Sequence, residues 1–297
     1  MTDSIDLVTA APLRATALHV AVALASSFLL AVAACSGEKG GAQAKTALQS
    51  GGAVDEESRG DVIIAAPTGR YLGGAVSSAG SVSGTVSLKA SLNPLAKGLE
   101  PLPPVPAGRD SALCGKVIPD SSLQRKGTAG GLGNVILWLE GVRQGKPIPL
   151  EKRIELESDH CLLTPRVQAT VVGSAVNVIG HDDFRQHLRF IAAGEPQARA
   201  AILLGSNEQV IPSNLPASAP ALVIVKDADH PWPRAYIAVF DHPYFAITKP
   251  DGSFSIDGVP PGKYTLVAWH ERTGKSEQTV EVSANGAAKV SVALEGK

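Results

Sequence analysis

The order of apolar and polar residues predicts a chain built mainly from short β-strands. Alternation of the two kinds, typical of a strand with one buried face, occurs in residues 81–88, 253–256, 263–269, 278–282 and 289–294. Apolar runs predict further strands at residues 134–140, 221–225 and 234–240, and residues 170–179 predict two strands about a turn. Gly/Pro turns and the lack of a long amphipathic helix favour an all-β fold of sandwich modules. A turn or two of helix is expected only within residues 192–201.

The N-terminus has a different pattern, because residues 15–34 are almost all apolar or small. A run this short and this close to the N-terminus is typical of a secretory signal peptide. Its ending, Val32-Ala33-Ala34-Cys35, resembles the bacterial lipobox. The resemblance implies that residues 1–34 are removed and that Cys35 becomes the lipid-carrying first residue of the mature protein.

The same resemblance predicts where the protein resides. Ser36 follows the cysteine, whereas an Asp at this position is the usual inner-membrane signal of such lipoproteins. We therefore expect a lipid-anchored protein of the cell envelope, held in the outer membrane and facing the periplasm or the exterior. Residues 35–79 are rich in Gly, Ala, Ser and charge, and they predict a flexible tether.

Cysteine use predicts one disulfide. After Cys35 only Cys114 and Cys161 remain, and an even pair in an exported, oxidising compartment is most simply a disulfide.

Charge excludes one class of partner. Of 27 basic and 28 acidic residues, the signal peptide carries Arg14, Asp3 and Asp6, so the mature chain has 26 of each and is formally neutral. A nucleic-acid-binding protein needs a basic face, and we expect no nucleic-acid partner.

Residues 248–266 contain the most specific motif in the chain. Asp251-Gly252 predicts a tight turn in which Gly supplies a positive φ, and a second turn follows at residues 260–262. The motif resembles the carboxypeptidase regulatory-like domain, a transthyretin-like β-sandwich, over residues 243–297. The resemblance implies a structural or adhesive role and no catalytic residues. The usual first strands of that domain are missing directly upstream, and strands between residues 81 and 140 are the candidates to supply them.

The middle of the chain resembles a cupredoxin of the plastocyanin kind. The resemblance rests on residues 161–167, residues 176–183, His187 and residues 230–239, and it covers about residues 150–240 within a region that we assign to residues 80–242. It implies a β-sandwich with its metal ligands on two loops at one pole. His187 and His230 match the two imidazole ligands.

The other copper ligands of that family are missing. The position of the cysteine is occupied by Asp227 and that of the methionine by Pro233, and the sole methionine of the chain is Met1. A blue-copper site requires the thiolate, so we expect no such site. Two hypotheses remain for His187, Asp227 and His230. They are either relics at the rim of the sandwich or a two-histidine, one-carboxylate site for Cu²⁺ or Zn²⁺, to which His181 would add a ligand.

The sequence predicts no enzyme. It contains no Gly-x-Ser-x-Gly elbow, His-Glu-x-x-His helix, P-loop or dinucleotide-binding fingerprint. The first expectation is a binding or scaffolding protein of the envelope, with an envelope protein as a possible partner. An alternative is carbohydrate or peptidoglycan binding through the regulatory-like domain, in which the candidate stacking residues are Trp232, Tyr236, Tyr244 and Trp269, although each of these also suits a core position.

Overall fold

The computed structural model describes Ile64, Leu215, Ala217 and residues 70–89, 102–126, 130–206, 208–210 and 220–295. Contacts divide the chain into Met1–Gly52 and Ala53–Lys297, and all described residues belong to the second unit. The signal peptide and Cys35 lie outside the described residues. In the described part, no helix is long and apolar enough to cross a bilayer.

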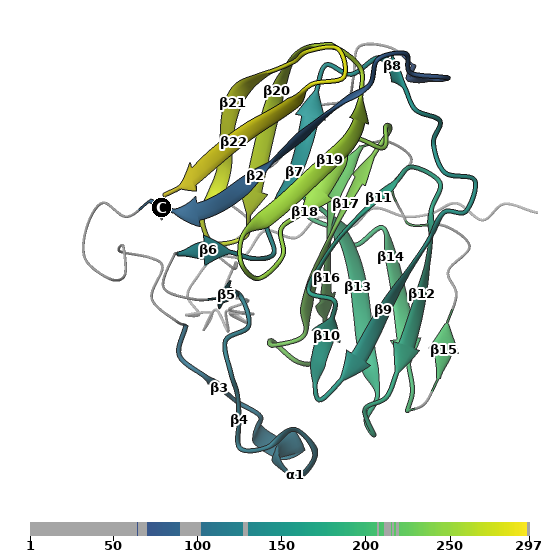
Figure 1. The fold of residues 1–297 in the computed structure, drawn as a ribbon. Helices are drawn as coiled ribbons and strands as arrows, with labels where there is room; N and C mark the ends of the chain where they lie inside the picture. Colours follow the sequence, from purple (N-terminus) through teal and green to yellow (C-terminus); the bar gives the residue numbers. More distant parts are fainter. Residues whose placement is uncertain are drawn as a thin grey trace, which may run out of the picture. The chain divides into compact units, whose positions relative to one another are not determined.

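Strands from both ends of the described chain form the C-terminal sandwich (Figure 1). One sheet has the order β18-β7-β20-β21, and the other has β19-β2-β6-β5 with β22 paired to β2. Their apolar faces enclose a core that includes Val82, Leu137 and Phe254. The strands are β2 (Gly80–Leu88), β5 (Arg125–Lys126), β6 (Gly131–Leu132), β7 (Ile136–Glu140), β18 (Phe245–Ile247), β19 (Ser253–Val259), β20 (Gly262–His270), β21 (Gly274–Val282) and β22 (Ala287–Leu294).

The middle sandwich lies between these strands in sequence (Figure 1). Its sheets have the orders β10-β9-β12-β15 and β11-β17-β16-β13-β14, and they enclose a second core that includes Leu156, Phe190 and Ile237. The strands are β9 (Arg153–Asp159), β10 (Leu162–Thr164), β11 (Val167–Val171), β12 (Ala175–Gly180), β13 (Gln186–Ala192), β14 (Ala200–Leu204), β15 (Gln209–Val210), β16 (Ala221–Asp227) and β17 (Arg234–Phe240). The all-β sandwich class expected from the sequence is confirmed.

Small elements complete the described structure. β3 (Val105–Pro106) pairs with β4 (Val117–Ile118), and β1 (Leu72–Gly73) pairs with β8 (Gln144–Gly145). Between β3 and β4 lie the 3₁₀ turn η2 (Gly108–Asp110) and α1 (Ser111–Cys114). The helix expected within residues 192–201 is wrong. There β13 extends to Ala192, β14 begins at Ala200, and a Glu195–Arg199 ion pair spans the turns between them.

The nearly continuous apolar runs correspond to strands that are buried on both faces. In β7, Leu137 and Leu139 face the core of the C-terminal sandwich, whereas Ile136 and Trp138 face outward into a separate apolar cluster. That cluster also contains Tyr236, Ala238 and Phe240 of β17. Because β7 and β17 each have two buried faces, neither shows the alternation of a half-exposed strand. The cluster joins the two sandwiches.

Strand pairing also divides the region 80–242 that the sequence assigns to the cupredoxin-like module. β2 pairs with β19 and β22, and β7 pairs with β18 and β20. Both strands are therefore part of the C-terminal sandwich, and residues 153–240 form the middle one. Among the described strands, β18 pairs only with β7 and β19 only with β2, so the backbone hydrogen bonds of the C-terminal sandwich require β7 and β2.

Part of residues 35–79, expected to be a tether, is instead packed against the sandwiches. Ile64 is only 5% exposed and lies in the cluster that joins them. Tyr71 belongs to the core of the C-terminal sandwich, and its hydroxyl donates to the Lys146 carbonyl at 2.6 Å. Apolar residues spaced this far apart show no periodicity, so the sequence pattern does not reveal them.

A buried ion pair crosses the junction of the sandwiches. Arg166, which precedes β11, donates to both carboxylate oxygens of Glu271 at 2.6 Å and to the Ser121 hydroxyl at 3.0 Å. Burial alone would lower the pKa of the Arg166 guanidinium, but its hydrogen bonds to Glu271 outweigh burial and raise that pKa. A buried charge pair needs this bidentate geometry to offset the cost of leaving water.

A second polar contact lies beside this pair. Arg272 donates to the Ser122 hydroxyl at 2.8 Å and contacts Asp120 at 3.4 Å. His270, at the end of β20, is fully buried and accepts from the Arg272 N–H at Nδ1. Burial lowers the pKa of His270 to about 4.

His270 makes stability depend on pH. The ring is neutral in the folded protein and binds a proton more readily in the unfolded chain, whose ordinary pKa is 6.5. The free energy of unfolding should therefore fall as pH decreases from 6.5 towards 4, by about 2 kcal/mol between pH 7 and pH 5. Urea unfolding of a His270→Asn variant, which keeps an acceptor for Arg272, should show about 2 kcal/mol less pH dependence. His160→Asn, at an exposed position, is the control, and equal slopes for wild type and His270→Asn would contradict the assignment.

The expected disulfide is present. Cys114 and Cys161 are bonded with their Cα atoms 5.6 Å apart, and the bond links the end of α1 to the turn between β9 and β10.

Loss of this disulfide should destabilise the protein. The linked residues are 47 positions apart, and closing a loop of that length restricts the unfolded chain by about 4 kcal/mol. We expect the double variant Cys114→Ser, Cys161→Ser to lose several kcal/mol in urea unfolding while its far-UV circular dichroism stays that of a β-protein. Reduced wild type should match the variant, and an unchanged unfolding midpoint in both would contradict the prediction.

Candidate functional site

The candidate site lies at the pole of the middle sandwich where β13 begins and β16 ends. Antiparallel pairing places Leu188 opposite Asp227, so His187 lies next to the loop that follows β16. The N–H of Ala228 donates to the His187 carbonyl at 2.9 Å, and the His187 N–H donates to Asp227 Oδ1 at 3.1 Å. The fold therefore brings the backbone of His187 and the Asp227 carboxylate together at this pole, and the same loop carries His230.

The His230 side chain is buried between two carboxylates. Its Nδ1 lies 2.6 Å from Asp227 Oδ2, and its Nε2 lies 3.1 Å from Asp110 Oδ2. The side chains of His230 and Asp227 are 4% and 0% exposed. Both ring nitrogens thus face hydrogen-bond acceptors, and a metal could reach either nitrogen only after displacing a carboxylate.

Aromatic rings fix the orientation of His230. The Phe184 ring lies 4.9 Å from the His230 ring, edge to face, and the Trp232 ring lies 5.1 Å away. Both aromatic residues also pack against a small apolar cluster that contains Cys161, Ala107 and Ile118. The imidazole is therefore enclosed by aromatic and apolar surface on the sides that its two carboxylates leave open.

Residues 102–126, which we call the strap, cover this pole. The strap contains β3, η2, α1, β4 and β5, and it contributes Asp110 and the cluster residues Ala107 and Ile118. The links that hold it there include the disulfide, the Asp110–His230 contact, the hydrogen bond from Arg166 to Ser121, and the contacts of Asp120 and Ser122 with Arg272. The pole of the middle sandwich is therefore closed.

The His187 ring does not join His230. Its Nδ1 lies 2.5 Å from Asp229 Oδ2 in a pair that is about half exposed. In the part of the chain that the structure describes, no three His, Cys, Asp or Glu side chains are grouped to hold a metal. The copper thiolate is also excluded, because both described cysteines are in the disulfide. Of the three residues proposed from the sequence, the structure brings the side chains of Asp227 and His230 together, and it places the His187 ring apart.

His181 and its acidic neighbours have other roles. Asp182 accepts from the Ser158 hydroxyl at 2.7 Å and from the Cys161 N–H at 2.9 Å. The latter bond supports the two-residue turn between β9 and β10, in which His160 and Cys161 both have positive φ, at 50° and 63°. His181 lies 3.4 Å from Glu157 at the surface. Asp182 thus holds the cysteine of the disulfide in a conformation that non-glycine residues rarely adopt.

Sequence reasoning missed Asp110, the second carboxylate at His230. It lies 120 positions from His230, in a segment without a strand or helix pattern. The expected disulfide was the available signal, because Cys114 lies only four residues after Asp110, and a bond to Cys161 brings this segment to the middle module.

The aromatic residues considered for carbohydrate stacking are mostly inside the protein. Tyr236, Tyr244 and Trp269 are buried, and Trp232 is half-buried against His230. Tyr244 also donates its hydroxyl to the Gly258 carbonyl at 3.0 Å. A stacking platform requires an exposed ring face, so these residues contribute to the cores instead.

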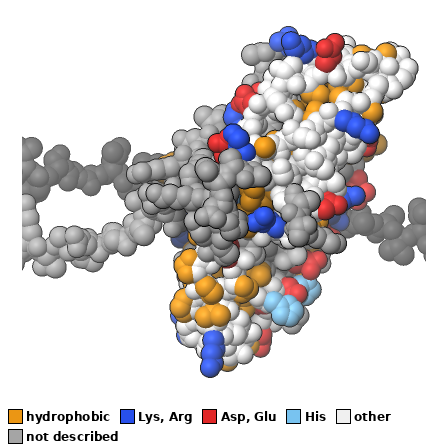
Figure 2. All heavy atoms as spheres, turned by 60° about the vertical axis from the view of Figure 1, so that its left-hand side comes forward, with side chains coloured by type: hydrophobic (Ala, Val, Ile, Leu, Met, Phe, Trp, Pro, Cys, Tyr) orange, Lys and Arg blue, Asp and Glu red, His pale blue; other side chains and the backbone are white. Residues whose placement is uncertain are grey.

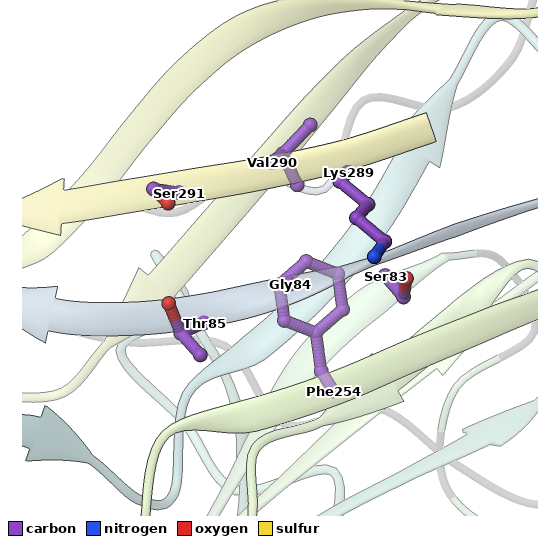
Figure 3. Close-up of a pocket in the computed structure, with 7 residues that line it drawn as sticks. All are labelled: Ser83, Gly84, Thr85, Phe254, Lys289, Val290 and Ser291. Carbon is purple, nitrogen blue, oxygen red and sulfur yellow. The ribbon is translucent and has the colours of Figure 1, made fainter. Parts of the chain in front are cut away.

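A shallow hollow of about 440 Å³ on the C-terminal sandwich is a second place to consider (Figure 3). Gly84 of β2 lies directly between Phe254 of β19 and Val290 of β22. Figure 3 shows the Phe254 ring across Gly84 and the Lys289 side chain reaching towards Ser83. A Cβ on Gly84 would lie 1.8 Å from the Val290 carbonyl oxygen, so only glycine fits. The hollow thus lies over a position where only glycine fits, and the Phe254 ring on the neighbouring strand covers that glycine. Phe254 is the one aromatic side chain of the hollow, and it is buried.

Comparisons with known proteins bear on both modules. A family model described as the carboxypeptidase regulatory-like domain matches residues 222–295, which confirms that resemblance and extends it upstream into β16 and β17. None of the curated proteins matches the sequence.

Two solved structures are similar to part of the chain. The copper-containing nitrite reductase from Thermus scotoductus SA-01 is 19% identical with a TM-score of 0.26, over 32% of this chain and 23% of that one. A mutant of amicyanin with Cu(I) is 16% identical with a TM-score of 0.24, over 31% of this chain and 96% of that one. The low TM-scores mean that neither structure defines the fold of the whole chain.

Proposed function

We propose that this chain is a non-enzymatic lipoprotein of the cell envelope that acts as a scaffolding or binding module, with its two sandwiches acting as one body. The observation that carries the proposal is the closed pole. His230 and Asp227 are the best candidates for chemistry in the described chain, and they are bonded to each other, bonded to Asp110 and covered by the strap. A substrate would have no access to them.

The junction between the sandwiches supports the scaffolding part of the proposal. The apolar cluster around Trp138 and Tyr236 and the Arg166–Glu271 pair both cross it. A buried bidentate pair tolerates little relative motion, because separating its partners leaves a buried charge unpaired, at a cost of about 3–5 kcal/mol. Two sandwiches held in this way present one fixed surface to a partner.

The anchoring part rests on the lipobox resemblance at Cys35. In the proposed mature protein, acyl chains at Cys35 hold the body at the outer membrane, facing the periplasm or the exterior. Ile64, 29 positions after Cys35, is buried in the apolar cluster that joins the sandwiches.

Two alternatives from the sequence are less well supported. Carbohydrate binding through the regulatory-like domain lacks an exposed aromatic platform among Tyr236, Tyr244 and Trp269. Metal binding retains one favourable observation, the short contact between Asp227 and His230, because a carboxylate and an imidazole suit Cu²⁺ or Zn²⁺.

The anchor is tested with Cys35→Ser. This variant should lack the acyl chains and move from the membrane fraction to the soluble fraction, because a single buried CH₂ group contributes about 0.8 kcal/mol to membrane binding and an acyl chain contains many. Mass spectrometry of the mature N-terminus and membrane fractionation measure the change. Ser36→Ala is the matched control and should remain lipidated. A membrane-bound Cys35→Ser protein processed at the same residue would show that the lipobox assignment is wrong.

The metal alternative is tested with Cu²⁺. Bound copper quenches nearby tryptophan fluorescence, and Trp232 lies 5.1 Å from the His230 ring. We expect Cu²⁺ to quench wild type and Trp232→Phe by the same small fraction, because both nitrogens of His230 have acceptor partners, and we expect no intense blue absorption. Quenching that is strong in wild type and lost in Trp232→Phe would place copper at His230 and favour metal binding over scaffolding.

A further inference from the structure

The strap exposes many apolar side chains for its length. Seven large hydrophobic side chains are exposed among the described residues, and four of them belong to the strap: Leu102, Val105, Leu113 and Val117, at 47%, 36%, 52% and 51%. Figure 2 shows hydrophobic side chains gathered in the lowest part of the molecule, where Figure 1 places α1. Single exposed apolar residues are normal on a protein surface, whereas four on one short segment make that segment a candidate contact surface.

The charges of the strap are sorted between its two sides. Both of its carboxylates face inward, because Asp110 contacts His230 and Asp120 contacts Arg272. Burial would raise the pKa of Asp120, but hydrogen bonds from Ser122 and from the Leu102 N–H outweigh burial and lower it. Asp120 is therefore a carboxylate whose hydrogen bonds are made within the protein.

Two cations of the strap, Arg109 and Lys116, are exposed to solvent. The Arg109 side chain is 78% exposed, with only a 3.7 Å contact to Asp110, and Lys116 is exposed. Between Leu102 and Pro119 no acidic residue is exposed, and the exposed charged side chains there are the cations Arg109 and Lys116.

We propose that the outward side of the strap is a docking surface for an anionic lipid bilayer. Aliphatic side chains that enter the acyl boundary, together with Lys and Arg that contact lipid phosphates, are the two components of interfacial membrane binding. The strap presents both, and the disulfide, the His230 contact and the Arg272 contacts fix it in place beforehand.

A lipid surface fits the strap better than a groove on another protein. The hot spots of protein interfaces are rich in Trp and Tyr, and the exposed side chains of the strap include no aromatic residue. The proposed mature protein is formally neutral, so its net charge does not attract it to an anionic bilayer. The attraction to anionic lipid must therefore come from the cations of the strap. This docking proposal depends on the proposed function in one respect: the lipid anchor would keep the strap close to a bilayer.

The test uses the mature chain with Cys35→Ser, so that binding does not depend on lipidation. Flotation with vesicles of phosphatidylglycerol alone should carry the protein upward at low salt, and vesicles of phosphatidylcholine alone should not. Binding should weaken as salt is raised, because exposed charges are screened.

Variants assign the binding to the strap. Leu113→Ser with Val117→Ser, and separately Arg109→Gln with Lys116→Gln, should each weaken binding to phosphatidylglycerol vesicles by about tenfold or more. Because these side chains are exposed, the folded structure should persist, which circular dichroism checks. The matched controls are Leu203→Ser on β14 and Lys263→Gln on β20, both exposed elsewhere, and they should bind as wild type does.

Three results would overturn the proposal. These are no preference for phosphatidylglycerol, controls that weaken binding as much as the strap variants do, or no vesicle binding together with loss of an envelope protein partner in the strap variants. The last result would assign the strap to a protein partner. None of them would affect the lipidation of Cys35, which is measured separately.

Discussion

The apolar layer between the two sandwiches is the contact on which the remaining structure depends. Ile136 and Trp138 of β7 meet Tyr236 and Phe240 of β17 there, so both strands are buried on two faces. The layer also excludes water from Arg166 and Glu271, and a charge pair in such a place is retained only when both partners are fully hydrogen bonded. His270, next to Trp269 of this layer in β20, is also buried, and burial lowers its pKa.

The strap depends on this layer as well. In its C-terminal part, Ser121 accepts from Arg166 and Ser122 accepts from Arg272, and its N-terminal part closes the pole through Asp110 and the disulfide. One segment therefore contacts both sandwiches. At the pole of the middle sandwich, His230 makes a structural contact with carboxylates from two segments of the chain.

The sequence predicted most strands, because alternation and apolar runs report burial directly. Residues 81–88 and 263–269 correspond to β2 and β20, and the apolar residues 234–240 correspond to β17. The disulfide followed from the count of cysteines. The partners of His230 were only half predictable: Asp227 is three residues away in one loop, whereas Asp110 is distant and follows no period. Ile64 could not be found from sequence either, since one buried residue leaves no pattern.

The burial of Ile64 limits how far the protein can extend from a lipid anchor at Cys35. If Cys35 carries the lipid, 29 positions separate the acylated residue from Ile64, the first residue that the structure describes. A chain spans at most about 3.5 Å per residue, so Ile64 can stand no more than roughly 100 Å from the bilayer. In this proposal, the surfaces that the protein can contact are those within that distance of the membrane that anchors it.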